Sequence, residues 1–255
     1  MALMTTTFIS DTLDLQTAVN ILMPDRITPD EEPATLYLLH GLSGDYSSWM
    51  LRTSLYRYAD GRPFIIIMPS VDRSFYTDMA VGNRYWTYLT KELPDKLHQW
   101  LPLTGKRSRQ FVAGLSMGGY GALKWGLNAP EQFGGIVSMS GAVDLEAALA
   151  RSPEFLPAFS AIFGHPDTFK GSANDLYHLA QKASSDGGAL PEILQFCGKA
   201  DFLYEDNLRF KAALDDSRLP HRFFDKPDTG HEWAYWDECV QYTLSWIEQR
   251  LKVAK

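Results

Sequence analysis

The sequence predicts an α/β protein in which a mainly parallel sheet is covered on both faces by helices. Short apolar runs bounded by turn residues recur along the 255 residues, and several are apolar at consecutive positions. Such runs are typical of strands buried on both faces of a parallel sheet. Segments of helical length with a three-to-four residue periodicity lie between them, and this alternation is typical of the α/β class. The length, with 45% hydrophobic and 22% charged residues, suits a single domain over residues 1–255.

The predicted strands begin with a hairpin and continue as a series of core strands. Two stretches of alternating polarity, Thr6–Leu13 and Gln16–Leu22, predict an antiparallel hairpin at one edge of the sheet. The predicted core strands are Ala34–Leu39, Phe64–Met68, Gln110–Leu115, Gly135–Met139, Ile193–Cys197 and His221–Asp225. The clearest helical periodicity falls in Trp86–Leu101, Gly118–Leu127, Tyr204–Leu214 and Trp233–Leu251.

One long segment breaks this alternation. Between Gly141 and about Leu190, prolines and glycines recur among aromatic residues. The aromatic residues are Phe155, Phe159, Phe163, Phe169 and Tyr177. A long excursion between two core strands predicts a small cap-like insertion, at about residues 142–190, over the carboxyl edge of the sheet. A surface excursion with its own small aromatic cluster is the alternative.

The net charge, the first residues and the two cysteines indicate which partners and which cellular compartment to expect. A net charge of −7 disfavours nucleic acid and anionic membranes as partners, because both attract clustered Lys and Arg. The first residues lack the basic segment of a signal peptide, and no later run is long enough to span a bilayer. Nothing in the sequence requires a disulfide between Cys197 and Cys239, so a reduced, cytoplasmic protein is the simpler expectation.

The strongest chemical signal is the pentapeptide Gly114-Leu-Ser116-Met-Gly118, which follows an apolar strand and opens a helix. A sharp turn between strand and helix strains the central residue and lifts its hydroxyl clear of the sheet. The flanking glycines are needed because side chains there would strike the neighbouring strand and helix. We therefore predict that Ser116 is a nucleophile; the alternative is a glycine-rich turn with an idle serine.

A serine hydroxyl needs a base, and in this architecture the acid and then the base follow the serine along the chain. The histidines after Ser116 are His165, His178, His221 and His231. The first two fall in the predicted insertion, and His221 opens a strand. His231 lies in a loop between the last strand and the last helix, at the carboxyl edge of the sheet, and is therefore the predicted base.

The acid must orient the base and stabilise its imidazolium. Asp201 follows a core strand at the carboxyl edge of the sheet and is the predicted acid, with Asp144, one strand earlier, as the next choice. Asp206 lies in the following helix and is expected to be a surface charge. Asp225 and Asp228 stand too close to the strand end that carries His231 to reach its far nitrogen easily.

An oxyanion hole needs two backbone donors. The N–H of Met117, next to the nucleophile, is one predicted donor, and the N–H of Leu42 is the other. Gly41 allows the backbone to approach a substrate closely. His40 precedes the nucleophile and adjoins a strand end, so a structural histidine that holds this loop is expected there.

The sequence contains no metal or cofactor motif. The histidines are scattered without paired ligand spacing, Cys-x-x-Cys is absent, and no glycine-rich phosphate loop follows a first strand. We therefore expect neither a metal nor a cofactor.

The chain resembles the esterase D and S-formylglutathione hydrolase family of α/β-hydrolases, and within it the small bacterial tributyrin esterases. The resemblance covers most of the chain and rests on Tyr37–Gly44, Phe75–Asp78, Gly114–Gly121, Cys197–Tyr204 and Gly230–Trp233. It implies the α/β-hydrolase fold, a triad of Ser116, Asp201 and His231, and Leu42 as the second oxyanion donor. It also implies hydrolysis of acetyl to butyryl esters without a cofactor.

One departure from the family pattern separates the candidate functions. S-formylglutathione hydrolases usually carry His where this chain has Tyr120, which favours a short-chain carboxylesterase acting on a small-molecule ester. The alternatives are S-formylglutathione hydrolysis, deacylation of carbohydrate or phenolic esters, acyl transfer, and a catalytically silent esterase-like binding protein. The sequence leaves the formation of a homo-oligomer open.

Overall fold

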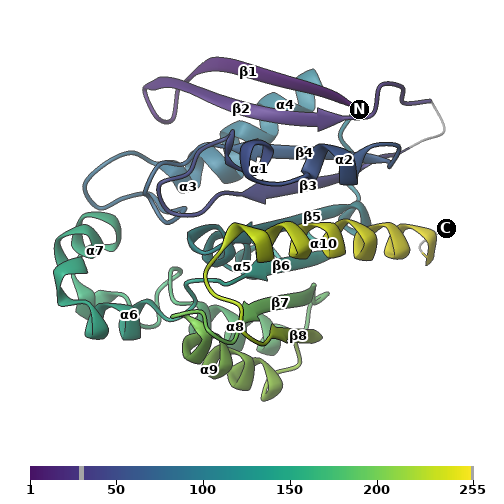
Figure 1. Ribbon diagram of the computed structural model, residues 1–255. Coiled ribbons are helices and arrows are strands. Elements are labelled where there is room, and N and C mark those ends of the chain that lie inside the picture. The colour runs from purple at the N-terminus through teal and green to yellow at the C-terminus, as the bar shows by residue number, and fades with distance from the viewer. Residues whose placement is uncertain (29–31, 254–255) are drawn as a thin grey trace.

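A mixed sheet of eight strands forms the centre of the protein (Figure 1). The structure is a computed structural model and describes residues 1–28 and 32–253. The strands are β1 (Ala2–Ser10), β2 (Leu15–Met23), β3 (Ala34–Leu39), β4 (Phe64–Pro69), β5 (Gln110–Leu115), β6 (Gly135–Met139), β7 (Glu192–Gly198) and β8 (His221–Lys226). Their spatial order is β1-β2-β4-β3-β5-β6-β7-β8.

The predicted edge hairpin is confirmed, but its first strand lies closer to the N-terminus than predicted: β1 ends at Ser10, and residues 11–13 lie in the turn. β1 and β2 pair antiparallel from Ala2 opposite Met23 to Ser10 opposite Leu15. β2 joins β4 antiparallel, whereas the strands from β4 through β3 to β8 are all parallel. The carboxyl ends of these parallel strands therefore share one edge, and loops that follow different strands meet there.

Helices cover both faces of the sheet, which explains why the core strands are apolar at consecutive positions. The helices are α1 (Ser48–Arg52), α2 (Leu55–Ala59), α3 (Tyr85–Thr87), α4 (Leu93–Trp100), α5 (Met117–Asn128), α6 (Leu145–Arg151), α7 (Leu156–Phe163), α8 (Leu176–Ser185), α9 (Tyr204–Asp215) and α10 (Trp233–Val253). Residues of α1, α2 and α10 pack in one core cluster, and residues of α4, α5, α8 and α9 pack in the other. In β3, Leu36 and Leu38 belong to the cluster formed with α1, α2 and α10, whereas Tyr37 belongs to the cluster formed with α4, α5, α8 and α9.

The helix predicted over Trp86–Leu101 is interrupted. A π-helical turn, η1 (Tyr88–Glu92), separates α3 from α4, and the N–H of Leu93 donates to the carbonyl of Tyr88. Pro94 is the physical reason, because it has no N–H to donate to the carbonyl four residues earlier and the helix widens just before it.

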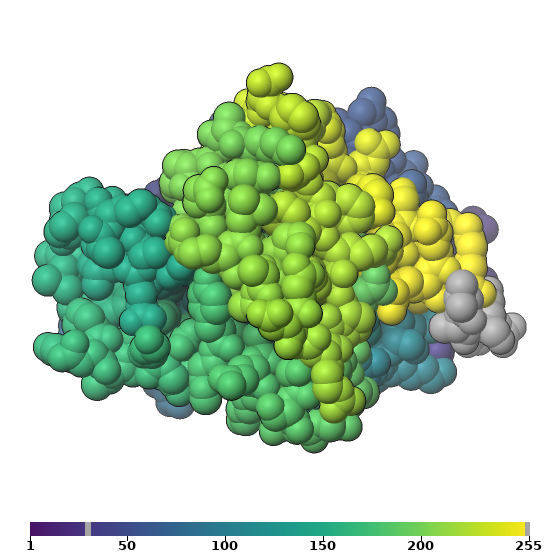
Figure 2. Space-filling view, turned by 90° about the horizontal axis from the view of Figure 1, so that it is seen from below, coloured from purple at the N-terminus to yellow at the C-terminus, as the bar shows by residue number. Residues whose placement is uncertain are grey.

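The segment between β6 and β7 contains α6, α7, α8 and the 3-10 turns η3 (Pro153–Phe155) and η4 (Pro166–Thr168). α6 and α7 project beyond one end of the sheet, where Figure 2 shows them as a lobe. The aromatic residues of this segment join the main core: the ring of Phe163 lies 5.9 Å from that of Phe75 and 6.2 Å from that of Tyr120. These aromatic residues also contact one another, so the cluster that they form is continuous with the main core.

Cys197 and Cys239 are both free and buried. Across residues 1–28 and 32–253, no helix is long and apolar enough to cross a membrane.

Candidate active site

Ser116 occupies the strained turn between β5 and α5. Its backbone has φ 53° and ψ −117°, a combination that non-glycine residues rarely adopt. A Cβ atom on Gly114 would lie 2.3 Å from the carbonyl oxygen of Gly118, and one on Gly118 would lie 2.5 Å from that of Leu39. The explanation offered for the two flanking glycines is therefore confirmed, because the turn packs directly against its own helix and β3.

The structure brings the predicted nucleophile, base and acid together. Nε2 of His231 lies 3.0 Å from Oγ of Ser116, and Nδ1 of His231 lies 2.9 Å from Oδ2 of Asp201. With Nδ1–H donating to the carboxylate, Nε2 is left as the acceptor for the serine hydroxyl. These three side chains therefore form one continuous hydrogen-bonded chain across three loops.

The loops after β7 and β8 position the acid and the base by holding each other. The N–H of Ala200 donates to the carbonyl of Thr229 at 2.9 Å. A Cβ atom on Gly198 would lie 2.1 Å from that same carbonyl oxygen, so the two loops are in direct backbone contact. The ring of His231 is fixed further by Phe202 and Trp236, whose ring centroids lie 4.7 and 4.8 Å away.

The side chain of Asp201 is fully buried. Burial raises the pKa of its carboxyl, but the hydrogen bond and charge of His231, the N–H of Leu203 and the hydroxyl of Ser140 together lower that pKa below its usual value. The Leu203 N–H lies 2.9 Å from Oδ1. Asp201 therefore remains ionised and accepts the His231 N–H.

The other candidate acids do not contact His231. Asp144 caps α6 by accepting from the N–H of Ala147 at 3.0 Å, and it forms an ion pair with Arg209 at 3.0 Å. The expectation that Asp206 is a surface charge is wrong, since it is 1% exposed and pairs with both Arg151 and Arg209. Arg151 comes from the segment between β6 and β7, whose position over α9 the sequence could not show.

The loop after β3 carries the second predicted oxyanion donor. Gly41 and Leu42 line the same cleft as Ser116 and His231, and Met117, as the first residue of α5, has no acceptor for its N–H within the helix. The predicted structural role of His40 is confirmed. Nε2 of His40 accepts from the N–H of Val71 at 3.1 Å, so Nδ1–H donates to the carbonyl of Gly41 at 2.8 Å. Burial lowers the pKa of His40, which keeps it neutral.

Two further residues support this loop and were not predicted from the sequence. The hydroxyl of Tyr76 donates to the carbonyl of His40 at 2.7 Å. Lys124, buried in α5, donates to the carbonyl of Tyr76 and to the hydroxyl of Thr77, each at 2.8 Å. The available signal was a lysine inside an otherwise apolar helix, together with the Phe75–Asp78 motif.

A cleft of about 460 Å³ surrounds Ser116. It is lined by Gly41, Leu42, Ser43, Gly44, Ser48, Arg52, Leu115, Ser116, Phe202, His231, Trp233 and Trp236. These lining residues, all in the described part of the chain, include a guanidinium but no carboxylate and no residue of 142–190. Among residues 1–28 and 32–253, no cluster of three or more His, Cys, Asp or Glu side chains could hold a metal ion.

A family model named Esterase, described as "Putative esterase", matches residues 10–244. The chain belongs to this esterase family. The match extends from the edge hairpin to the last helix and includes the whole cleft around Ser116.

The esterase is similar to characterised proteins over nearly its full length. It is 27% identical to the acetyl esterase of Caldicellulosiruptor saccharolyticus, covering 98% of this chain and 99% of the relative. The fluorophosphonate-binding serine hydrolase F of Staphylococcus aureus is 36% identical, with a TM-score of 0.88 and coverage of 96% and 98% of the two chains. An S-formylglutathione hydrolase of Staphylococcus aureus is 35% identical, with a TM-score of 0.85 and the same coverage. The protein is thus a serine ester hydrolase with the α/β-hydrolase fold.

Proposed function

We propose that Ser116, His231 and Asp201 are the catalytic triad of an esterase that hydrolyses short-chain acyl esters through an acyl-enzyme intermediate. The observation that carries this proposal is the continuous hydrogen-bonded chain from Ser116 Oγ through His231 to Asp201. In this arrangement a hydroxyl, an imidazole and an ionised carboxylate stand in the order that activates a serine.

The chemistry follows from these positions. As Oγ of Ser116 attacks the ester carbonyl, its proton passes to Nε2 of His231, and Asp201 stabilises the imidazolium. The N–H groups of Met117 and Leu42 stabilise the oxyanion. When the tetrahedral intermediate collapses, the bond to the alcohol oxygen breaks, and the alcohol leaves with the proton from His231. Water then attacks the acyl-serine, with His231 as base, and releases the carboxylic acid and free Ser116.

The cleft around Ser116 has an apolar wall that suits the acyl group of an ester. The aromatic residues of the segment 142–190 pack against each other and the core, with Phe159 and Phe163 centroids 4.9 Å apart, and none of them lines the cleft. The apolar wall near Ser116 is instead formed by Leu115, Trp233 and Trp236. The preference for short acyl groups is supported by the relative named acetyl esterase, which aligns over 98% of this chain.

S-formylglutathione hydrolysis is the second candidate; one observation favours it, and another removes an objection to it. Arg52 lines the cleft, and none of the other described residues that line it carries a carboxylate. Its guanidinium could therefore bind a carboxylate of an acidic thioester. Tyr120, the departure from the family pattern, lies in the core, where its hydroxyl donates to the carbonyl of Asn174. Because Tyr120 does not line the cleft, it leaves the thioester candidate in place.

The test combines covalent labelling with a substrate series. The wild-type enzyme should bind a fluorophosphonate probe and turn over p-nitrophenyl acetate to butyrate faster than octanoate, whereas Ser116→Ala should do neither. S-formylglutathione measured in parallel separates the two candidates by kcat/KM. Labelling that persists in Ser116→Ala would refute the assigned nucleophile, and fastest turnover of the octanoate would refute the short-chain preference.

A further inference from the structure

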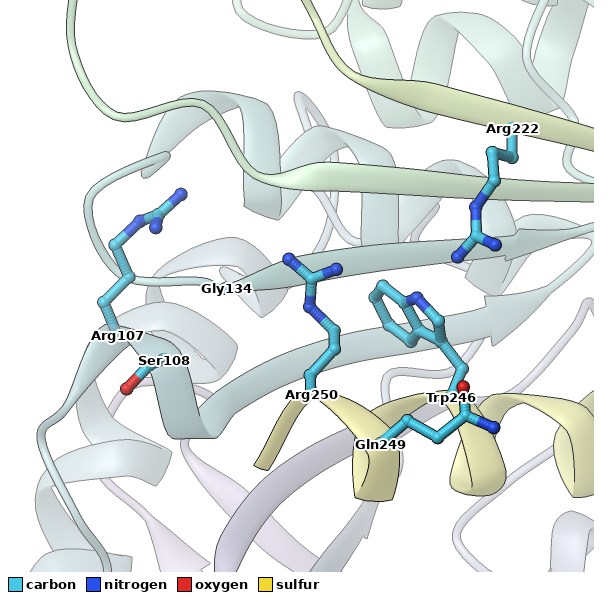
Figure 3. A pocket seen from close by; sticks show the side chains of 7 residues that line it. All are labelled: Arg107, Ser108, Gly134, Arg222, Trp246, Gln249 and Arg250. Carbon is cyan, nitrogen blue, oxygen red and sulfur yellow. The ribbon is translucent and has the colours of Figure 1, made fainter. Parts of the chain in front are cut away.

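A second cavity, of about 470 Å³, is lined by the seven residues labelled in Figure 3. It lies at the end of β5 opposite to Ser116, because Arg107 and Ser108 come just before this strand and Ser116 just after it. Arg107 and Ser108 line it from the 3-10 turn η2 (Arg107–Arg109) just before β5, and Arg222 lines it from β8. Trp246 and Arg250 line it from the last turns of α10. Since a six-residue strand spans about 20 Å, this cavity is separate from the cleft around Ser116.

The cavity is rich in positive charge, although the protein as a whole carries −7. Arg107, Arg222 and Arg250 come from three different elements, and in Figure 3 the guanidinium of Arg250 lies between the other two. Glu192 contacts two of them: one carboxylate oxygen pairs with Arg222 at 2.9 Å and the other with Arg250. Three guanidinium groups around one carboxylate leave an excess of about two positive charges.

Arg107 is the group that Glu192 leaves unpaired. Its Nε donates to the carbonyl of Pro130 at 3.0 Å, but its buried Nη2 has no hydrogen-bond partner among the described residues. Burial and the charge of Arg250 both lower the pKa of Arg107, so the two guanidinium groups repel each other. Arg250 is paired with Glu192, whereas Arg107 has no carboxylate partner among the described residues, so an anion bound beside Arg107 and Arg250 would offset the repulsion between them.

We propose that this cavity is a binding site for a small dianion, with a phosphate group as the ligand chemistry that fits it best. Guanidinium groups match phosphate oxygens with two parallel hydrogen bonds each. The ring of Trp246 lies 5.0 Å below the guanidinium of Arg250 and restrains it, and Ser108 and Gln249 supply neutral polar groups at the rim. The source is inorganic phosphate or a phosphorylated metabolite.

Isothermal titration of the full-length enzyme, at low ionic strength in a chloride buffer, tests this site. Inorganic phosphate and glycerol 1-phosphate serve as the two probes. We expect saturable binding with one site per chain, weakened about ten-fold or more in Arg107→Gln and in Arg250→Gln, since each removes a charge-assisted hydrogen bond. Tighter binding of glycerol 1-phosphate indicates a metabolite as the ligand, and equal or tighter binding of inorganic phosphate indicates the free ion.

Two controls separate this site from general charge effects and from the Ser116 cleft. Arg57→Gln removes the same charge from an exposed position on α2 and should leave binding unchanged. Ser116→Ala should also leave it unchanged, and both arginine variants should keep wild-type turnover of p-nitrophenyl acetate, which shows that they fold. Absence of saturable binding in the wild type, or equal weakening in Arg57→Gln, would overturn the proposal.

Discussion

The hydroxyl of Tyr76 donates a hydrogen bond of 2.7 Å to the carbonyl oxygen of His40. His40 in turn donates to the carbonyl of Gly41, and Lys124 from α5 holds the carbonyl of Tyr76 at 2.8 Å. The helix that begins behind Ser116 is therefore linked, through one tyrosine, to the loop that carries Leu42. Tyr76 has the geometry of a positioning residue for the proposed oxyanion hole, because it holds the loop without touching the cleft.

Tyr76→Phe should lower kcat for p-nitrophenyl acetate several-fold while KM changes little. The variant removes one neutral hydrogen bond, worth about 1 kcal/mol, and loosens a donor that acts mainly in the transition state. Tyr242→Phe, at a partly exposed position of α10, is the control and should match the wild type. A rise in KM with unchanged kcat would show that Tyr76 affects ground-state binding instead.

Asp201→Asn should reduce kcat by about 10⁴-fold, because an amide holds His231 in the wrong tautomer. Asp144→Asn should leave kcat near the wild-type value, since Asp144 interacts with Ala147 and Arg209 and not with His231. Steady-state turnover of p-nitrophenyl acetate by both variants checks this. Near-normal turnover in Asp201→Asn would remove Asp201 from the proposed triad.

Lys124 should make the stability of the protein depend on pH. Burial lowers its pKa in the folded protein from 10.5 to about 7. Between these two values the unfolded chain holds a proton that the folded chain has lost, so the free energy of unfolding should rise with pH, by up to about 1.4 kcal/mol per pH unit. Below pH 7 both states are protonated and this contribution is constant.

Urea unfolding from pH 6 to 10 measures this slope. In Lys124→Met the rise should be much smaller, while Lys91→Met, which removes an exposed lysine, should retain it. An identical slope in the wild type and in Lys124→Met would mean that Lys124 keeps its proton when buried.

Arg52 should discriminate between charged and neutral substrates. It lines the cleft around Ser116, and no carboxylate is among the described residues that line it. Arg52→Gln should raise KM several-fold for 4-acetoxybenzoate and leave it unchanged for the methyl ester of the same compound, because only the first carries a carboxylate. Arg57→Gln controls for net charge, and an equal effect of both variants would show only long-range electrostatics.

Much of the fold and of the candidate site was accessible from the sequence because the signals were local. The strand, the turn with its two glycines and the helix around Ser116 are contiguous, and each flanking glycine follows from the crowding of that one turn. Predicting that Asp201 and His231 lie close together also required the direction of the strands. Parallel strands end at a common edge, so loops that follow neighbouring strands such as β7 and β8 meet there.

What the tertiary structure alone decided involves side chains that meet across distant segments. Asp206 is buried because Arg151 reaches it from another helix, and no residue near Asp206 in the sequence indicates that Arg151 is its partner. The same holds for Tyr76 with His40, and for the arginines that converge at the far end of the sheet. Periodicity and turn signals report which face of an element is apolar, whereas the pairing of buried charges and donors depends on how elements pack. The sequence therefore determined the chemistry expected at Ser116, and the packing determined which residues hold its loops in place.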